Sequence, residues 1–462
     1  MLAGQTIRGR DLRTRMSDSL AVVVLAAGSG TRMKSALPKV LHQIAGRPML
    51  AHVLSVAKTL GAKRVAVVTA PNANDVAALA REWGAESIVQ ERQLGTGHAV
   101  LATESALKNF TGNLLVLFGD APLLTPATLG RLIAALNKGA DIAALGFRAA
   151  DPTGYGRMIV EHDRLTRIVE HKDATPEERR IDLCFAGMLA GKAATVFELL
   201  HRVGNQNAQG EFYLTDLIAI AAARKLHCAA VEGAEEEMLG VNSRAQLAEA
   251  EAAFQARRKA DLMDQGVTFL APDTVFLAAD TVIEPDAVIG PYVVFGPGVT
   301  VRAGAEIRAF CHIVSCEIGR GTIVGPFARL RDGAKLDADV HIGNFVEVKN
   351  SHLESGAKVN HLTYIGDAHI GARTNIGAGT ITCNYDGFTK HRTEIGADAF
   401  IGSNTALVAP VSVGDGAIVA AGSVITDNVE PNALAVARGR QVNKPGAAET
   451  IRNKNRKKKA QK

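Results

Sequence analysis

Aromatic side chains are scarce in this sequence of 462 residues: they make up 5% of the chain, and only one of them is Trp. Proteins that bind single-stranded nucleic acid by stacking rely on aromatic platforms, so this composition disfavours such a reader. Glycine is abundant instead, with 45 residues, which favours an architecture with many turns.

Long apolar runs are also missing. No stretch approaches the ~18 consecutive apolar residues of a membrane-spanning helix, so the sequence predicts no membrane span. The cysteines are odd in number and scattered: Cys184, Cys228, Cys311, Cys316 and Cys383. No second Cys/His pair at ligand spacing accompanies any of them, so a structural zinc site is disfavoured. Because no secretory apolar segment precedes them, we expect reduced thiols in a cytoplasmic protein.

The net charge of +5 comes from the two ends of the chain. The last twelve residues carry seven Lys or Arg and no acid, so removing them turns the net charge to −2. Residues 1–16 add four Arg against one Asp. Basic ends on an acidic body are typical of solvated tails, so we expect no nucleic-acid partner. The Arg-rich start is also consistent with translation beginning at Met16.

The first half of the chain alternates short apolar runs with helical patterns. Continuous apolar runs of this kind are typical of buried parallel strands. We predict strands at Ala21–Ala27, Arg64–Thr69, Asn113–Phe118 and Asp141–Phe147, and a hairpin over residues 157–169. Strands that alternate with helices predict a mostly parallel α/β sheet. Residues 243–264 follow as a linker helix, rich in Ala, Glu, Gln, Arg and Leu.

Beyond residue 266 the pattern changes to aliphatic residues spaced six apart. Small or β-branched residues recur four positions after many of them, such as Ala287, Ala305 and Ala417. Each hexad is then one side of a triangular coil, which predicts a parallel β-helix. The predicted inward positions are Leu277, Ile283, Ile289, Phe295, Val301, Ile307, Ile313, Ile318, Val324, Leu330, Leu336, Ile342, Val348, Leu353, Val359, Ile365, Ile370, Ile376, Ile395, Ile401, Leu407, Val413, Val419 and Ile425. Thr382–Glu394 interrupts the repeat and is predicted to be a loop outside the prism.

A glycine-rich segment, LAAGSGTRM, follows the first predicted strand. Gly28 and Gly30 allow backbone N–H groups to face an anion, and we expect a helix N-terminus after them. Arg32 and Lys39 can supply positive charge to phosphate oxygens. Taken alone, such a turn more often has a structural role than a phosphate-binding one, and it is not a P-loop.

Further polar residues stand at strand ends nearby in the predicted sheet. Gln90 ends a strand, and LGTGH opens a helix. Asp120 lies at the carboxyl end of a strand, where α/β sheets bind ligands. A hard cation that bridges phosphates would use this carboxylate. The structural alternative is that Asp120 caps a helix.

Several motifs in one order carry a resemblance to a known family. They are LAAGSGTRM…LPK, QLGTGHA, FGDAP, DPTGYGR, IVEHKDAT, QGEFYLTD and GVN, followed by hexapeptide repeats. Over residues 20–440 the sequence resembles the bacterial bifunctional N-acetylglucosamine-1-phosphate uridyltransferases/glucosamine-1-phosphate acetyltransferases. The resemblance implies an α/β Rossmann-like nucleotidyltransferase domain followed by a left-handed parallel β-helix of hexapeptide repeats. Domains are expected at 1–17 (basic extension), 18–242 (uridylyltransferase), 243–266 (linker helix), 267–440 (acetyltransferase) and 441–462 (basic tail).

For the first domain the resemblance implies uridylyl transfer from UTP. The residues that match the family's UTP contacts are Leu25, Ala26, Ala27, Gly28, Arg32, Lys39, Gln90, Gly95 and Thr96. Asp120 and Asn242 match the Mg²⁺ ligands, and Gly156 and Glu170 match contacts to the sugar phosphate. One position departs from the family: Phe185 stands where the pattern has an Asn that touches the sugar.

For the second domain we weigh six histidines of the repeat region, each of which can be a plain surface residue. His361 lies between inward Val359 and Ile365, so its ring is expected to point outward. A His base suits acetyl transfer to an amine near neutral pH. The resemblance makes His361 that base. It assigns the sugar phosphate and acetyl group to Arg331, Lys349, Tyr364, Asn375, Asn384 and Tyr385, and acetyl-CoA to Ala378, Ser403, Ala421 and Arg438. It also implies a homotrimer with sites between subunits.

Three functions remain open from the sequence. The leading hypothesis is a two-site enzyme that makes UDP-N-acetylglucosamine for peptidoglycan and lipopolysaccharide precursors. The second is a sugar-nucleotide pyrophosphorylase with a purely structural β-helix, against which His361 and Lys349 argue. The third is a non-enzymatic regulator of similar architecture, against which the retained Arg32, Lys39 and Asp120 argue.

Overall fold

The computed structural model describes residues 20–461, which form two compact units that divide between Arg258 and Lys259. The basic extension at residues 1–17, with the alternative start at Met16, lies outside the described residues. No helix among the described residues is long and apolar enough to cross a membrane.

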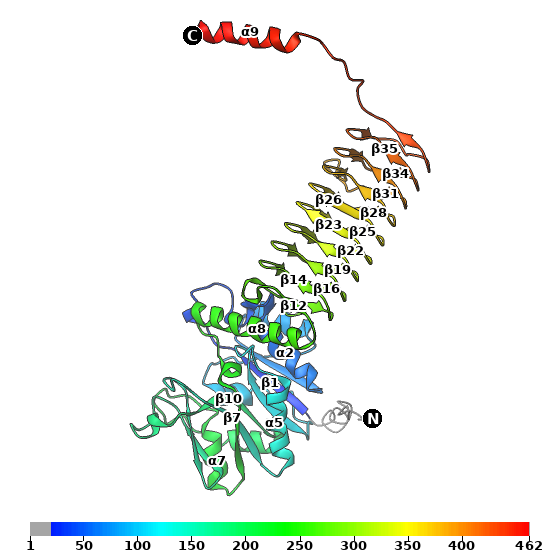
Figure 1. The fold of residues 1–462 in the computed structure, drawn as a ribbon. Coiled ribbons are helices and arrows are strands. Elements are labelled where there is room, and N and C mark those ends of the chain that lie inside the picture. The colour runs from blue at the N-terminus through cyan, green and yellow to red at the C-terminus, as the bar shows by residue number, and fades with distance from the viewer. Residues whose placement is uncertain (1–19, 462) are drawn as a thin grey trace, which may run out of the picture. The chain divides into compact units, whose positions relative to one another are not determined.

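The first unit is built on one mixed sheet with strand order β11-β7-β10-β6-β1-β4-β5 (Figure 1). Its strands are β1 (Leu20–Ala26), β4 (Arg64–Thr69), β5 (Glu86–Val89), β6 (Asn113–Phe118), β7 (Ile142–Arg148), β10 (Leu183–Lys192) and β11 (Cys228–Glu232), with the hairpin β8 (Arg157–Glu161) and β9 (Arg164–Val169) and the small pair β2 (Gln43–Ile44) and β3 (Arg47–Pro48). All the predicted strands are confirmed. The strand predicted to end at Gln90 is also present, as β5. Sequence analysis missed β11 and β10, and β10 runs antiparallel to both of its neighbours.

Helices cover both faces of this sheet because its central strands are apolar on both sides. Along β1, Ala21, Val23 and Leu25 belong to one buried cluster and the alternating Val22 and Val24 to the other. The helices are α2 (Met49–Thr59), α3 (Asn74–Glu82) and α5 (Pro126–Asn137) on one face, and α4 (Thr96–Leu101), α6 (Ala193–Leu200) and α7 (Asp216–Ala223) on the other. The short 3₁₀ turns of this unit are η1 (Thr31–Met33), η2 (Lys39–Leu41), η3 (Glu178–Arg180) and η4 (Glu235–Met238). One more, η5 (Pro272–Thr274), belongs to the second unit.

The linker helix is α8 (Arg244–Asp264), as the sequence predicts. The boundary between the two compact units falls inside it. The C-terminal tail forms α9 (Ala447–Ala460), and none of its residues is buried.

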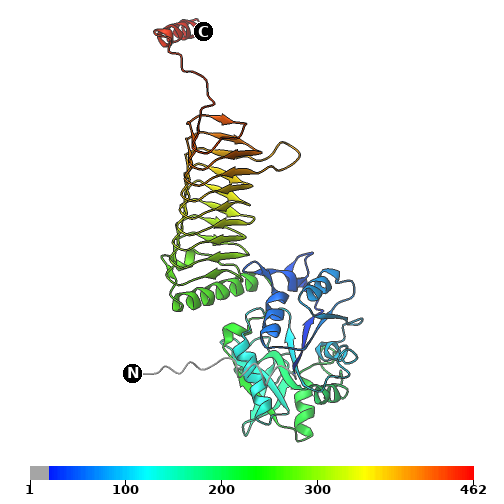
Figure 2. The ribbon, with the colours of Figure 1, turned by 90° about the vertical axis from the view of Figure 1, so that its right-hand side faces the viewer.

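The second unit is a stack of triangular coils whose strands form three parallel sheets (Figures 1 and 2). The β12 sheet contains β12 (Thr268–Phe269), β14 (Val288–Ile289), β17 (Glu306–Ile307), β20 (Ile323–Val324), β23 (His341–Asn344), β26 (Lys358–His361), β29 (Asn375–Ile376), β32 (Phe400–Ile401), β35 (Ile418–Val419) and β37 (Leu434–Ala435). The β15 sheet contains β15 (Val294–Phe295), β18 (His312–Ile313), β21 (Arg329–Arg331), β24 (Glu347–Lys349), β27 (Tyr364–Gly366), β30 (Ile381–Cys383), β33 (Ala406–Val408) and β36 (Val424–Ile425). The β13 sheet contains β13 (Val282–Ile283), β16 (Val299–Val301), β19 (Cys316–Ile318), β22 (Ala334–Leu336), β25 (His352–Leu353), β28 (Ala368–Ile370), β31 (Thr393–Ile395) and β34 (Val411–Val413).

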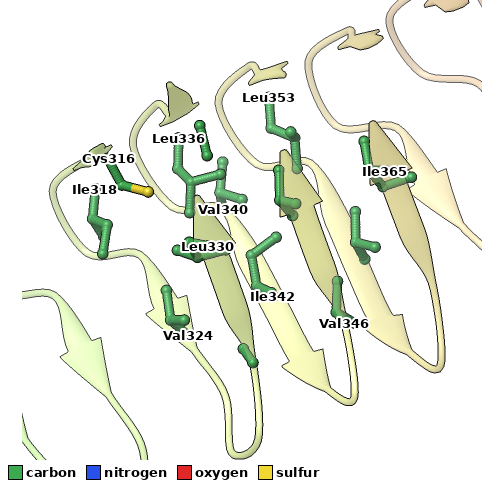
Figure 3. Close-up of a cluster of buried hydrophobic side chains, with 14 of the residues drawn as sticks. Cys316, Ile318, Val324, Leu330, Leu336, Val340, Ile342, Val346, Leu353 and Ile365 are labelled. Atoms are coloured by element: carbon green, nitrogen blue, oxygen red, sulfur yellow. The ribbon is translucent and has the colours of Figure 1, made fainter. Parts of the chain in front are cut away.

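The interior of the prism is filled by the hexad residues (Figure 3). Every inward position predicted from the six-residue period is at most 4% exposed, and the small corner residues Ala287, Ala305 and Ala417 are fully buried. The predicted β-helix is therefore confirmed residue by residue. Its core is one continuous apolar column, which is what stacked repeats bury.

One loop leaves the stack, and Figure 2 shows it projecting from the upper coils. The predicted bounds, Thr382–Glu394, are too wide at both ends. Thr382 and Thr393 lie in β30 and β31, where they are at most 1% exposed and pair with the next coil, so only residues 384–392 leave the prism.

Candidate active sites

The first candidate site lies at the carboxyl ends of β1 and β6. Two adjoining cavities of about 440 and 340 Å³ meet there and share Thr96, Phe118, Asp120 and Asn242. Every residue predicted for uridylyl transfer lines one or both of them: Leu25, Ala26, Ala27, Gly28, Arg32, Lys39, Gln90, Gly95, Thr96, Asp120, Gly156, Glu170 and Asn242. The structure thus brings these residues together from positions more than 200 residues apart.

The glycine-rich segment does not lead into an α-helix, so the expected helix N-terminus is wrong. A single 3₁₀ turn, η1, follows instead, and α2 begins only at Met49. Gly30 has a left-handed backbone with φ of 61°, and a Cβ there would lie 2.7 Å from the Cβ of Lys39. Gly30 is needed so that Lys39 can approach the loop this closely.

Lys39 joins the two proposed metal ligands. Its ammonium donates to the Oδ2 of Asp120 and, at 2.9 Å, to the Oδ1 of Asn242. Asp120 does not cap a helix, because the N-cap of α5 is Thr125, whose hydroxyl accepts from the N–H of Thr128. The structural alternative for Asp120 is therefore wrong.

The donor chemistry around Asp120 and Asn242 fits Mg²⁺. A carboxylate oxygen and an amide oxygen converge on one cation, here the Lys39 ammonium. No group of three or more His, Cys, Asp or Glu suited to a metal occurs among residues 20–461. Mg²⁺ is commonly held by one or two protein oxygens with phosphates and waters completing its shell, so two oxygens suffice.

The loop between β5 and α4 closes the side of the site where UTP is predicted to bind. Gln90 follows β5 and donates to the carbonyl of Gly95 at 3.2 Å. A Cβ on Gly95 would lie 2.6 Å from the carbonyl of Phe212, so only glycine fits there. Gln93 donates to the carbonyl of Ala27 and ties this loop to the glycine-rich segment. Sequence analysis missed Gln93, and no signal beyond its place in QLGTG singles it out.

The part of the site where the sugar phosphate is predicted to bind is formed by the hairpin and β10. The Glu170 carboxylate accepts from the Thr215 hydroxyl at 3.1 Å, and burial raises its pKa above the ordinary value. Phe185 donates its N–H to the carbonyl of Gly156 at 2.8 Å. The Phe185 ring is 8% exposed and lines the larger cavity with Glu170, so an apolar wall stands where an amide is expected.

The second candidate site is on the outside of the prism. His361 ends β26 and is exposed, as the sequence predicts. Its Nδ1 lies 2.8 Å from the Oδ1 of Asn344, the residue that pairs with it on the preceding coil. Because an amide oxygen only accepts, this contact favours the tautomer in which Nδ1 carries the hydrogen and Nε2 has the lone pair. Sequence analysis missed Asn344, although the 17-residue coil spacing places it beside His361.

The residues matched to the sugar phosphate lie on the neighbouring sheet. Arg331 and Lys349 are register partners in β21 and β24. Arg331 donates to Glu347 at 2.7 Å and Asp332 at 2.8 Å. The Tyr364 hydroxyl lies 3.4 Å from the Asn384 amide nitrogen. These residues therefore line one face of the β15 sheet, whereas His361 and Asn375 lie in the β12 sheet.

The projecting loop is held together by contacts among its own residues. Asp386 accepts hydrogen bonds from the N–H groups of Thr389 and Phe388 and from His391, all at 2.7 Å, and its pKa is lowered chiefly by the Thr389 bond. The Lys390 ammonium lies 4.1 Å from the Tyr385 ring centroid. Phe388 at the loop tip is 92% exposed. The loop thus presents aromatic side chains on a fixed frame.

The residues matched to acetyl-CoA gather at the corner between the β12 and β15 sheets. Arg438 donates to the carbonyl of Ala421 at 2.7 Å. Ser403 accepts from the N–H of Gly422, and Ala378 accepts from the N–H of Asn404. Ala378, Ser403 and Ala421 therefore stack on successive coils, with the Arg438 guanidinium above the last.

Comparisons with known proteins agree with both halves. Residues 22–181 match the MobA-like NTP transferase domain, residues 280–314 match the bacterial transferase hexapeptide (six repeats), and residues 392–427 match the hexapeptide repeat of succinyl-transferase.

Near-full-length relatives share more than half of their residues with this chain. The bifunctional protein GlmU of Ruegeria sp. (strain TM1040) is 57% identical over 446 residues, which are 96% of this chain and 99% of that protein. Those of Azorhizobium caulinodans and Acidiphilium cryptum are 56% and 57% identical over 94% and 93% of this chain and 97% and 98% of their own. Such identity over both units shows that the chain belongs to the bifunctional GlmU family.

Proposed function

We propose that this chain makes UDP-N-acetylglucosamine in two steps, by acetyl transfer from acetyl-CoA to glucosamine-1-phosphate and then uridylyl transfer from UTP. The observation that carries the proposal is the convergence of all the matched uridylyl residues on two adjoining cavities. A cytoplasmic location would supply all three substrates.

In the first site the chain binds and orients, and it needs no covalent nucleophile. Lys39 and Arg32 neutralise the triphosphate, and the loop at Gly95 and Thr96 holds the base. Glu170 and Gly156 place the sugar phosphate so that one of its oxygens attacks the α-phosphorus in line as pyrophosphate leaves. Asp120 and Asn242 would hold Mg²⁺, which when bound neutralises charge on the phosphates.

In the second site His361 acts as general base. Its free Nε2 takes a proton from the 2-amino group as the nitrogen attacks the thioester carbonyl, and the CoA thiolate leaves. Arg331 and Lys349 bind the sugar phosphate through their charges. Asn344 holds the imidazole in the tautomer that this step needs.

The proposal is tested by assaying the two half-reactions separately on the full chain. We expect Asp120→Asn to abolish uridylyl transfer and leave acetylation unchanged. His361→Ala should do the reverse, because the removal of a general base typically costs ~10²–10⁴-fold. Acetylation that survives His361→Ala would instead favour a structural β-helix.

We also propose that the chain forms a homotrimer through one edge of the prism. Tyr292, Phe310, Phe327 and Phe345, the aromatic edge, occupy the corner between the β12 and β15 sheets on four successive coils. Their rings stack with centroids 5.0, 4.9 and 5.2 Å apart, and each residue is 46–56% exposed. Exposed apolar surface of this extent is typical of interaction sites.

The backbone supports the same proposal. All four residues have positive φ, between 56° and 62°, which is costly for bulky side chains. The corresponding positions at the other two corners are small or polar, for example Gly298, Asp339 and Asp398. The β13 sheet has charged or polar residues outward, which suits a solvent-facing side: Glu317, Lys335, His352, His369 and Glu394.

Light scattering of the double variant Phe327→Ser/Phe345→Ser measures this interface. We expect the variant to dissociate at concentrations where the parent protein is trimeric. Asp339→Ser, at an exposed position of another corner, is the matched control and should stay assembled.

A further inference from the structure

The Lys39 ammonium lies between two oxygens that come from distant parts of the chain. Asp120 is 81 residues away and Asn242 is 203 residues away, and both accept from the same nitrogen. The Lys39 and Asp120 side chains are 12% and 15% exposed, so this ion pair is largely withdrawn from water. A charged hydrogen bond in such a place is stronger than one on the surface.

These same two oxygens are the ones that would bind Mg²⁺ in the proposed uridylyl transfer. Mg²⁺ needs its ligands at 2.0–2.1 Å, whereas the ammonium stands 2.9 Å from Asn242. The ammonium and a divalent ion cannot share one point between two oxygens, because both repulsion and contact distances forbid it. Either cation can hold the pair, but not both.

The Lys39 ammonium also has a second candidate partner, the phosphates of a bound nucleotide. Lys39 lines the smaller cavity with Leu25, Ala27 and Gly28, where the triphosphate is proposed to bind. Its four-carbon side chain is flexible, and an ammonium is a good point-charge partner for phosphate. Movement of the ammonium from the oxygens to the nucleotide therefore exchanges one anionic partner for another.

We propose that Lys39 is an internal counter-ion that occupies the metal-binding oxygens until nucleotide and metal arrive together. This inference rests on the proposed uridylyl transfer and adds an order of events to it. Without nucleotide the ammonium competes with the metal, so metal binds weakly. Nucleotide draws the ammonium away and raises metal affinity, and by linkage metal raises nucleotide affinity by the same factor.

The test measures Mn²⁺ binding to the full-length protein by the electron paramagnetic resonance signal of free Mn²⁺, without nucleotide. The variant is Lys39→Met, which keeps most of the side-chain volume and removes the charge. We expect it to bind Mn²⁺ about tenfold more tightly than the parent protein, since one charged hydrogen-bonding competitor is gone. Unchanged or weaker binding by Lys39→Met overturns the proposal.

Arg32→Met is the matched control. Arg32 lines the larger cavity together with Asp120 and Asn242, so its removal changes the local field without vacating the oxygens. We expect less than a threefold change for Arg32→Met. If Arg32→Met increased the affinity for Mn²⁺ as much as Lys39→Met, the loss of any nearby positive charge would explain the result, and the proposed exchange would be overturned.

Two further arms separate this inference from the proposed function. Lys39→Met/Asp120→Asn should lose the tight binding, and if tight binding survives, the metal is bound elsewhere and the exchange is wrong. A non-hydrolysable UTP analogue should tighten Mn²⁺ binding more in the parent protein than in Lys39→Met, and an equal gain in both overturns the exchange. Synthesis of UDP-N-acetylglucosamine by the parent protein would in each case leave the proposed function standing.

Discussion

The two units place functional side chains in opposite ways. In the α/β unit, the strand ends, the hairpin and the segment before α8 bring Lys39, Asp120, Glu170 and Asn242 into a concave site within one chain. In the prism, each strand is two to four residues long and projects its polar side chains outward from flat sheets. His361 and Lys349 therefore stand on different faces.

The concave sheet edge gathers its candidate residues within one chain. The candidate residues of the prism lie on outward faces of two sheets, where the proposed trimer would add a neighbouring copy. In the proposed trimer, each cleft between neighbouring copies would be bounded by the β12 sheet of one copy and the β15 sheet of the next. The aromatic edge would lie on the axis of that trimer. Phe388, at the tip of the projecting loop, is a further exposed aromatic side chain of the prism.

The largest effect is expected from breaking the assembly. Phe327→Ser/Phe345→Ser should abolish acetyl transfer. Uridylyl transfer should remain within about twofold of the parent value, since the two residues are exposed and belong to the other compact unit. Half-reaction assays across a dilution series measure this. If acetylation persists in a variant shown to be monomeric, the prism site is complete in one chain. The proposed difference between the two units would then be wrong.

A smaller loss is expected from Asn344→Leu, which removes the acceptor that orients His361. For histidines that bind metals, losing the partner that orients the ring typically costs ~10–100-fold, and we expect a loss of that order here. We expect the loss in kcat for acetylation rather than in KM for the sugar phosphate, together with a changed pH profile. Asn344→Asp, which keeps an acceptor oxygen, should recover much of the rate. Equal losses in both variants would assign Asn344 a structural role.

The two units also differ in what their sequences reveal. The six-residue period predicts the inward aliphatic residues of the prism from Leu277 to Ile425, because each coil repeats the same local environment. It does not predict other core residues, such as Val299, Cys316 and Val411. The coil spacing places Asn344 beside His361 on the next coil, but it does not tell that the two outward side chains meet. In the α/β unit, β10 was missed because the residues that split its pairing, Ala186 to Met188, interrupt the strand pattern.

The candidate residues of the α/β site were found from motifs rather than from pattern. Gly30 and Gly95 carry that signal because close backbone approaches admit no side chain there. The contact of Lys39 with Asn242 spans 203 residues and leaves no local trace. Contacts between side chains that are far apart in the chain leave no periodic pattern in the sequence, so they could not be predicted from it.

Phe185→Asn tests how the first site binds the sugar phosphate in the proposed reaction. The Phe185 ring forms an apolar wall beside Glu170 and offers no hydrogen bond. An amide there adds one or two polar contacts, so we expect KM for N-acetylglucosamine-1-phosphate to fall up to about tenfold. Phe185→Leu keeps the wall apolar and should leave KM close to that of the parent. A higher KM in Phe185→Asn would mean that the ring itself contacts the sugar.

The smallest expected effect is on the stability of the α/β unit. This unit can be followed separately, because the only Trp of the sequence, Trp83, belongs to it. His52 is 6% exposed and lies 2.9 Å from the carbonyl of Ile44, and burial lowers its pKa to about 4. The unfolded chain binds the proton near pH 6.5, so this unit loses stability as pH falls from about 6.5 to about 4.

Between pH 7 and 5.5 the expected loss from His52 is about 1 kcal/mol. Urea unfolding followed by Trp83 fluorescence at the two pH values measures it. His52→Gln can still donate to Ile44 and carries no titrating group, so the variant should lose less stability over this interval than the parent. A parent and variant with the same pH dependence would place the sensitivity elsewhere in the unit, for example at His42, whose pKa is also lowered by burial.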